Sequence, residues 1–439
     1  MIKTTLKSIR DSLNDNFLRN NVIFFIGSMS VAFLNYLYYP VMTRLVDLET
    51  FGEIQTLISI LTQITVVTSV FGIVAVNITS HDKDDSKKAL VSKIEKVSII
   101  FMLAIFFLLV ILSPSLKENL QFASISPFFI LAILLPLSAI FAFRVAYLQG
   151  QHEFKSLSIA NLIFALLKLL LGVLAVITLA STFRAMIGIL IAQTLAIAYA
   201  LKKTIARLPL FKLDLRKIRA SRLKLLDREL VKELKYGSFI FLILFSVTIF
   251  YTFDIIVIKK FFSPTEAGLY SGIATVSRII FFANMSVSGV LLPSVKITNS
   301  KSENHKLLLK SLIIMSIISL PILLVFALFP EQILSLLIGH KYTAFASLLP
   351  YLSVSVILAS FINLLFYYFI ALRKYTIIIP AIAGLMGILL LSYLSHTTIN
   401  IVVYNFIIVN FIIAFALILF LFDAKKVKAR FKHGATNHA

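Results

Sequence analysis

Apolar runs of about 17 to 25 residues recur along the whole chain and are separated by short polar segments. A helix needs about 20 predominantly apolar residues to cross the hydrocarbon core of a bilayer. Six such runs precede a long basic stretch, at 22–42, 54–78, 94–112, 127–148, 157–179 and 185–201. Six more follow it, at 237–258, 268–292, 307–328, 348–372, 375–394 and 400–422. The pattern predicts an all-α integral membrane protein with about twelve transmembrane helices.

The composition agrees with a multi-pass membrane protein and excludes several other classes. Hydrophobic residues make up 59% of the 439 residues, against about 45–50% in soluble domains. The formal net charge is +22, but the cations lie in short segments between apolar runs, so we expect no nucleic-acid partner. There is no cysteine, and we find no Gly-rich phosphate loop, paired histidines or nucleophile elbow. We therefore expect no metal site, no cofactor and no enzyme activity.

The basic residues alternate between successive connecting segments. One set of segments is rich in Lys and Arg, at 3–19, 83–96, 155, 202–235, 296–310, 373–374 and 425–432. The alternate set holds only Arg44, Lys117, Arg184, Lys259, Lys260 and Lys341. Because cytoplasmic loops carry the excess of Lys and Arg, both termini are predicted to be cytoplasmic.

The basic stretch 202–235 divides the chain into two similar halves. Leu223, Leu226, Leu230 and Leu234 recur in it at helical spacing among cations, which predicts an amphipathic helix along the inner membrane surface. Its simplest role is an anchor between the halves, and a lipid-sensing role is the alternative. We expect a six-helix bundle at 1–201, a basic cytoplasmic linker at 202–235, a second bundle at 236–424 and a basic cytoplasmic tail at 425–439.

Weak internal similarity indicates that the two bundles are repeats. Residues 148–154 join spans four and five, and residues 370–375 join spans ten and eleven in matching positions. Phe51-Gly52 and Ala267-Gly268 open spans two and eight. Six spans per half return the chain to the same side, so the repeats would be parallel. Two such bundles would enclose a central cavity and permit alternating access.

Charged residues within the predicted spans are the first candidates for function, because they are costly in lipid unless they face a cavity or a partner. Lys168 lies near the middle of span five, and we expect it either to attract an anionic substrate or to be paired inside its bundle. Asp254 and Arg278 are predicted at similar depth in spans seven and eight, either as a structural ion pair or as a coupling or gating pair. Arg144 is close enough to a span end to snorkel. Arg44 follows Pro40 at the outer end of span one, where it is either an interfacial arginine with no special role or a residue that a proline kink turns inward.

Uncharged polar groups within spans form a second set. The amides of Asn35, Gln63, Asn77, Asn161, Gln193, Asn284, Asn363 and Asn405 would either bind sugar hydroxyls or, more commonly, join helices by hydrogen bonds. Tyr36, Tyr38, Tyr39, Tyr367 and Tyr368 lie near span ends, where tyrosine ordinarily serves as an interfacial anchor.

Two stretches resemble a known transporter family. Tyr39-Pro40-Val41-Met42-Thr43-Arg44 followed by Phe51-Gly52 is similar to the start of Wzx-type O-antigen flippases of the MOP superfamily. Residues 234–237, Asp254, residues 262–270 and Arg278 resemble the opening of that family's second half, and 148–154 with Lys168 are similar as well. The resemblance covers most of the chain and implies the MATE-like fold of that superfamily.

What the resemblance implies is a flippase for an undecaprenyl-pyrophosphate-linked oligosaccharide in the bacterial inner membrane. Its cationic central cavity would place Arg44, Lys168, Arg278 and Arg144 against the substrate, with Asp254 in coupling or gating. The coupling ion, proton or sodium, stays open. The expected partners are the lipid-linked oligosaccharide, membrane lipids, and a polysaccharide polymerase with its chain-length machinery.

Three alternatives remain open at this point. A multidrug and toxin exporter of the same superfamily would share the twelve spans, but exporting cations favours intramembrane carboxylates, of which Asp254 is the one we identify. A lipid II flippase usually has two further spans. A polytopic polysaccharide polymerase should show a substantial outer loop with Arg, His or acidic residues, whereas 329–347 contributes only Glu331, His340 and Lys341.

Overall fold

The computed structural model describes residues 16–81, 85–206, 208 and 228–434 and shows helices joined by short connections. The chain divides into two compact units, Met1–Ser238 and Phe239–Ala439. Among the described residues there is no β-strand. A lipid environment explains this, because only a helix satisfies every backbone hydrogen bond within one segment.

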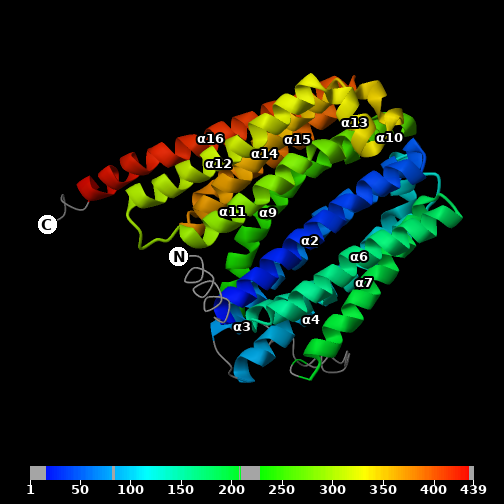
Figure 1. Cartoon of the computed structure of the whole chain (residues 1–439). Helices are drawn as coiled ribbons and strands as arrows, with labels where there is room; N and C mark the ends of the chain where they lie inside the picture. The colour runs from blue at the N-terminus through cyan, green and yellow to red at the C-terminus, as the bar shows by residue number, and fades with distance from the viewer. Residues whose placement is uncertain (1–15, 82–84, 207, 209–227, 435–439) are drawn as a thin grey trace, which may run out of the picture. The chain divides into compact units, whose positions relative to one another are not determined.

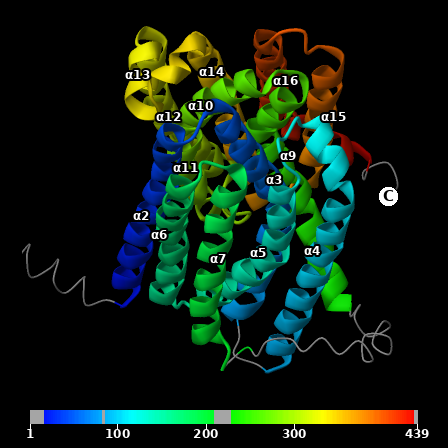
Figure 2. The ribbon, with the colours of Figure 1, turned by 90° about the vertical axis from the view of Figure 1, so that its right-hand side faces the viewer.

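The described residues before α9 in unit 1 form six long helices. They are α2 (Asn16–Leu45), α3 (Leu48–His81), α4 (Asp85–Asn119), α5 (Ser126–Gly150), α6 (Phe154–Thr178) and α7 (Thr182–Thr204). Helix α6 packs between α2 and α7, and α5 packs against α3, α4 and α7 (Figure 2). The predicted amphipathic segment lies largely within 209–227, outside the described residues, although Leu230 and Leu234 fall in the next helix, α9 (Arg228–Phe261).

Unit 2 holds most of α9 and the remaining helices (Figure 1). These are α10 (Pro264–Ser277), α11 (Ile279–Ser294), α12 (Lys301–Leu328), α13 (Pro330–Ile338), η1 (His340–Phe345), α14 (Leu348–Ala371), η2 (Tyr375–Ile377), α15 (Ile378–Leu394) and α16 (Ile399–Gly434). Helix α14 is the centre of the unit, because it packs against α10, α11, α12 and α16. Helix α16 continues into the predicted tail.

Eleven helical segments within the described residues are long and apolar enough to cross a membrane. They correspond to predicted spans two to twelve, and the first predicted span, 22–42, lies within α2. Span eight is covered by two consecutive helices, because α10 ends at Ser277 and α11 begins at Ile279, and together Pro264–Ser294 form one candidate span. Arg278 occupies the junction, although backbone hydrogen bonds continue across it from Arg278 to Ala274 and from Phe282 to Arg278.

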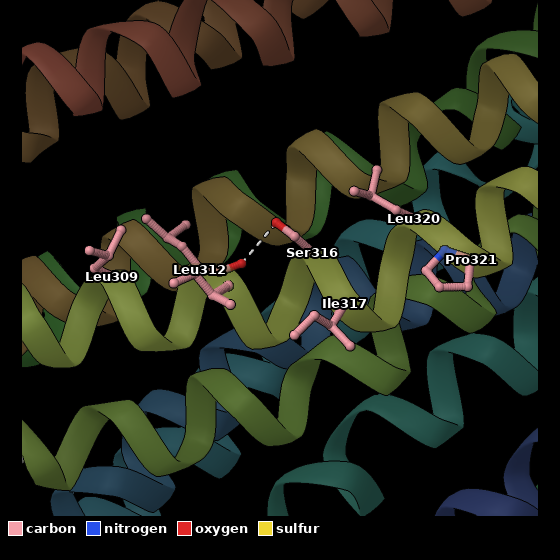
Figure 3. Close-up of a pocket in the computed structure, with 7 residues that line it drawn as sticks. Leu309, Leu312, Ser316, Ile317, Leu320 and Pro321 are labelled. Carbon is pink, nitrogen blue, oxygen red and sulfur yellow. Dashed lines mark hydrogen bonds between the residues drawn. The ribbon is translucent and has the colours of Figure 1, made fainter.

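Helix α12 carries an apolar surface groove. Its outer face carries a shallow apolar groove about 610 Å³ in volume, lined by Leu309, Leu312, Ile313, Ser316, Ile317, Leu320 and Pro321 (Figure 3). The hydroxyl of Ser316 donates to the carbonyl of Leu312 at 2.9 Å, which satisfies the hydroxyl within the helix. A surface of this kind suits acyl chains and offers no group that would bind a polar substrate.

The turns after α5 and α14 are built alike. After α5, the N–H of Glu153 donates to the carbonyl of Leu148 and His152 has a φ of 58°. After α14, the N–H of Lys374 donates to the carbonyl of Phe369 and Arg373 has a φ of 52°. Both are Schellman-type helix ends with a residue other than glycine in the left-handed position. These are the two turns that the sequence places in matching positions of the repeats.

Candidate functional site

Lys168 lies deep within α6 and is held by uncharged groups of α2. At 1.5 Å per residue it is about 15 Å from the end of the helix at Thr178. Its Nζ donates to Asn35 Oδ1 at 2.5 Å and lies 4.9 Å from the ring centre of Tyr38 and 5.8 Å from that of Tyr39. The Lys168 side chain is buried, and no acidic side chain in the described part of the chain forms an ion pair with it. The ammonium is therefore desolvated and lacks a compensating negative charge.

Small residues bring the aromatic partner of Lys168 into place. Gly172 lies one turn beyond Lys168, and a Cβ added there would stand 2.9 Å from the Tyr38 ring. On the other side of α6, a Cβ added at Gly188 of α7 would lie 2.7 Å from the Gly172 backbone. The two glycines therefore allow α2, α6 and α7 to approach closely. Tyr38 is fully buried, so the prediction that it serves as an interfacial anchor is wrong.

Asp254 and Arg278 form a buried ion pair in unit 2. Arg278 Nη2 lies 2.6 Å from Asp254 Oδ1, and the Tyr270 hydroxyl donates to Asp254 Oδ2 at 2.8 Å. The carboxylate on α9 thus receives one charged and one neutral donor from the segment formed by α10 and α11. This arrangement matches the predicted similar depth of the two residues. The position of Arg278 at the α10–α11 junction makes the pair a candidate for gating as well as for structure.

Arg144 is fully buried at the ends of three segments of unit 1. Its Nη2 lies 2.9 Å from Oε1 of Glu95 on α4, and its Nη1 donates to the Leu208 carbonyl at 2.5 Å. Leu208 packs in an apolar cluster with Val74, Ala75, Val91, Ile94, Phe143, Ala146 and Tyr147. The interpretation that Arg144 snorkels to the interface is wrong, because its side chain has no exposed surface. Its predicted contact with substrate stays a prediction.

Arg44, in contrast to the fully buried Arg144, is exposed. It is exposed at the end of α2, where its Nη1 donates to the Pro40 carbonyl at 2.9 Å. Lys259, which the sequence places in an outer segment, is instead buried within α9.

Several amides predicted within the spans join helices. Gln193 donates to Ser138 at 2.9 Å, Asn284 to Ser319 at 2.7 Å and Asn363 to Ser288 at 3.3 Å. The common explanation of intramembrane amides, helix-to-helix hydrogen bonding, is therefore confirmed for these three. Asn35 differs because its carbonyl oxygen accepts from a charged group.

Sequence reasoning missed two buried carboxylates. Glu95 pairs with Arg144, and Glu53 of α3 accepts from the Ala123 N–H at 2.7 Å and the Thr182 hydroxyl at 2.5 Å. Both lie within candidate membrane spans, so Asp254 is not the one intramembrane acid. Glu53 directly follows Phe51-Gly52, which opens predicted span two, and Glu95 follows a basic segment. From the sequence, each therefore resembles a residue at the end of a span.

Comparison with known proteins identifies the family. The model of a family described as polysaccharide biosynthesis protein matches residues 41–347, well over half of the chain. The chain belongs to this polysaccharide biosynthesis family. No curated protein matches it in sequence.

Solved structures show the fold of this family member. A lipid II flippase, MurJ, in an inward closed conformation is similar with a TM-score of 0.71 at 16% identity, over 92% of this chain and 87% of that one. An inward-facing multidrug resistance MATE family transporter of the MOP superfamily is similar with a TM-score of 0.68 at 14% identity, over 92% and 96%. The chain is a multi-pass membrane protein that shares the fold of these two transporters.

Proposed function

We propose that this polysaccharide biosynthesis protein is a flippase that moves an undecaprenyl-pyrophosphate-linked oligosaccharide across the bacterial inner membrane by alternating access. The single observation that carries the proposal is Lys168, a buried cation in mid-span whose partners are all uncharged. Burying such a charge in a membrane span carries a large desolvation penalty. An ionisable residue retained there is therefore first interpreted as part of a substrate or ion pathway.

The chemistry of Lys168 favours an anionic substrate group. At an effective dielectric constant of about 20, unit charges 4 Å apart attract by about 4 kcal/mol. A pyrophosphate that replaces the carbonyl of Asn35 as the partner of Lys168 gains this attraction, whereas a cationic drug is repelled. This difference favours the flippase over the multidrug exporter, whose substrates would need a free carboxylate. Asp254, Glu53 and Glu95 are each occupied by donors of the protein.

The surroundings of Lys168 suit a bound sugar-phosphate. Asn35 and Tyr39 are half-buried and lie beside the cation. Amide groups bind hydroxyls, and aromatic rings hold apolar faces of ligands. The lipid tail stays in the bilayer while the charged group engages Lys168.

For Arg278 and Asp254 we propose coupling or gating rather than direct binding of the pyrophosphate. In this arrangement the Arg278 charge is already neutralised by Asp254, so an anion gains less from it than from Lys168. Protonation of Asp254 or binding of sodium to it would free Arg278 at the α10–α11 junction. Arg44 remains a proposed substrate contact because it is exposed at the end of α2.

The decisive experiment compares two lysines of one helix. Lys168→Ala should abolish surface polysaccharide in a host that lacks the gene, with protein levels unchanged. Lys155→Ala, at the exposed start of α6, is the matched control and should restore wild-type surface polysaccharide. Wild-type polysaccharide in the Lys168→Ala strain would remove Lys168 from the mechanism.

A second measurement separates the flippase from a polymerase. In the deletion strain, lipid-linked sugars are extracted and their leaflet is determined with an impermeant probe. Complete repeat units should accumulate in the cytoplasmic leaflet. Repeat units that reach the outer leaflet but stay unpolymerised would contradict the flippase and indicate a polymerase.

A further inference from the structure

Five cationic or titratable side chains gather at one end of unit 2, and we name them the cationic corner: Lys296, Lys301, His305, Arg373 and Lys374. They come from three segments, the α11–α12 connection, the first turns of α12, and the turn after α14. Helices α12 and α14 pack against each other, and the start of one lies beside the end of the other. Nothing in the proposed translocation uses these residues.

Local hydrogen bonds fix the segments that carry the corner. The buried Asn304 donates to the Lys296 carbonyl at 2.8 Å and accepts from Asn299 at 3.2 Å, which holds the connection against α12. In the turn after α14, Arg373 donates its N–H to Ile370 at 2.9 Å and Lys374 to Phe369 at 3.0 Å. The cations are therefore presented by ordered backbone on both sides.

Contacts between the segments keep like charges close. Lys374 Nζ lies 5.4 Å from the ring centre of Phe369, and the His305 ring lies 6.3 Å from that of Tyr368, the neighbouring residue of α14. The pKa of Lys374 is lowered by partial burial and, in addition, by the positive charge of Lys301. The contact of His305 with Tyr368 places the first turns of α12, which carry Lys301, beside the end of α14.

The protein supplies no anion to offset this repulsion within its described residues. Lys301, Arg373 and Lys374 form no ion pair there with Asp or Glu. The nearby Glu303 is engaged by its own helix, since its carboxylate accepts from the Ser300 N–H at 2.8 Å in a capping box. The capping box also occupies the first turn of α12, so the corner does not depend on a free helix N-terminus.

Exposed apolar groups place the corner at the level of lipid headgroups. Ile297, next to Lys296, is 62% exposed, and Tyr375, next to Lys374, is 53% exposed while its ring contacts Phe239 at 4.7 Å. Tyrosines with one apolar and one wet side are typical of the membrane interface. An interface with clustered cations attracts phosphate groups of anionic lipids.

We propose that the cationic corner is a binding site for the phosphate headgroup of an anionic membrane lipid. Lys301 and Lys374 contact the phosphate from α12 and from the turn after α14, and the lipid neutralises charges that would otherwise repel each other. The bound headgroup thereby joins the two helices. This site is separate from Lys168 and does not depend on the proposed flippase activity.

The test follows thermal unfolding of the purified full-length protein in neutral detergent as short-chain phosphatidylglycerol is added. The wild type should be stabilised by phosphatidylglycerol and not by phosphatidylcholine. Lys301→Gln with Lys374→Gln should require an about tenfold or higher lipid concentration for the same shift, as expected from about 1 kcal/mol for each basic residue near the lipid surface. Lys301→Arg with Lys374→Arg should keep the wild-type response.

The control removes two other exposed lysines at helix ends. Lys155→Gln with Lys260→Gln changes one residue at the start of α6 and one in the last turn of α9 and should leave the response unchanged. If the Lys301 and Lys374 double variant does not fold, exposed Lys301→Gln alone should still weaken the response. An equal response in every variant would overturn the proposal, as would an equal shift with soluble pyrophosphate.

A further arm distinguishes two lipid sources of the same phosphate chemistry. Undecaprenyl phosphate replaces phosphatidylglycerol at matched concentration. If phosphatidylglycerol raises the unfolding temperature, the bound lipid is a structural phospholipid. If only undecaprenyl phosphate raises it, the phospholipid is contradicted and the cationic corner binds the polyprenyl carrier. Because the readout is unfolding and not export, failure here leaves the proposed flippase activity unaffected.

Discussion

Lys168 in unit 1 and Arg278 in unit 2 are both buried cations within membrane spans, but they have different partners. The ammonium of Lys168 meets an amide oxygen and two aromatic rings. The guanidinium of Arg278 meets the carboxylate of Asp254 at 2.6 Å. The charge of Lys168 is not neutralised by these partners and can attract an external anion. The charge of Arg278 is largely neutralised by Asp254. A charge in a membrane span therefore indicates function only after its partner is known.

The first prediction separates transport from stability at Lys168. Lys168→Met should abolish surface polysaccharide but change the free energy of unfolding little, because removing an uncompensated buried cation leaves no charge behind and the replacement keeps much of the volume. Surface polysaccharide is measured in cells, and unfolding in detergent by thermal melting. A large loss of stability in this variant would mean that Lys168 is structural.

The second prediction concerns the compensated cation. Arg278→Leu should destabilise the protein by about 3–5 kcal/mol, because the buried carboxylate of Asp254 loses its charged partner. The double variant Asp254→Leu with Arg278→Leu should recover most of this loss, since no buried charge remains. Thermal melting of both variants measures the difference. A stable double variant that still fails to export would support coupling or gating by the pair.

The third prediction disturbs the support of Lys168 without touching any charge. Gly188→Ala places a methyl group 2.7 Å from the Gly172 backbone and should cost about 1–3 kcal/mol by overpacking. Gly289→Ala in α11 is the control, because a Cβ there meets nothing within 4 Å. That control should be neutral or stabilising by up to about 1 kcal/mol from helix propensity. Equal melting temperatures for both variants would disprove the close approach of α6 and α7.

The smallest effect is expected in the turn that leads into α6. His152→Gly should stabilise by about 0.5 kcal/mol, since the relief of left-handed strain exceeds the entropy gained by the unfolded chain. Gln151→Gly, at a residue with φ of −83°, should destabilise by a similar amount. Chemical or thermal unfolding with both variants checks the sign. Destabilisation by His152→Gly would show that its left-handed backbone carries no strain.

Parts of the candidate site follow from residue spacing. The position of Lys168 in its apolar run gives its depth, and the counts from the ends of spans seven and eight place Asp254 and Arg278 at similar depth. Other parts do not follow. Arg144 has the same spacing whether it snorkels or pairs with Glu95, and Tyr38 looks like an interfacial residue until α6 packs over it. Spacing gives depth along a helix, but the partner depends on which helix lies opposite.

Sequence alone predicted the helical class and the positions of spans two to twelve. The physical reason is local: in lipid every backbone donor must be satisfied within its own segment, so the length of an apolar run sets the length of a helix. Tertiary structure alone decided that Lys168 meets Asn35 and that Arg144 meets Glu95. Those contacts depend on how helices distant in the chain are rotated and how closely they approach each other. Small residues such as Gly172 and Gly188 permit the close approach, and no local sequence pattern encodes it.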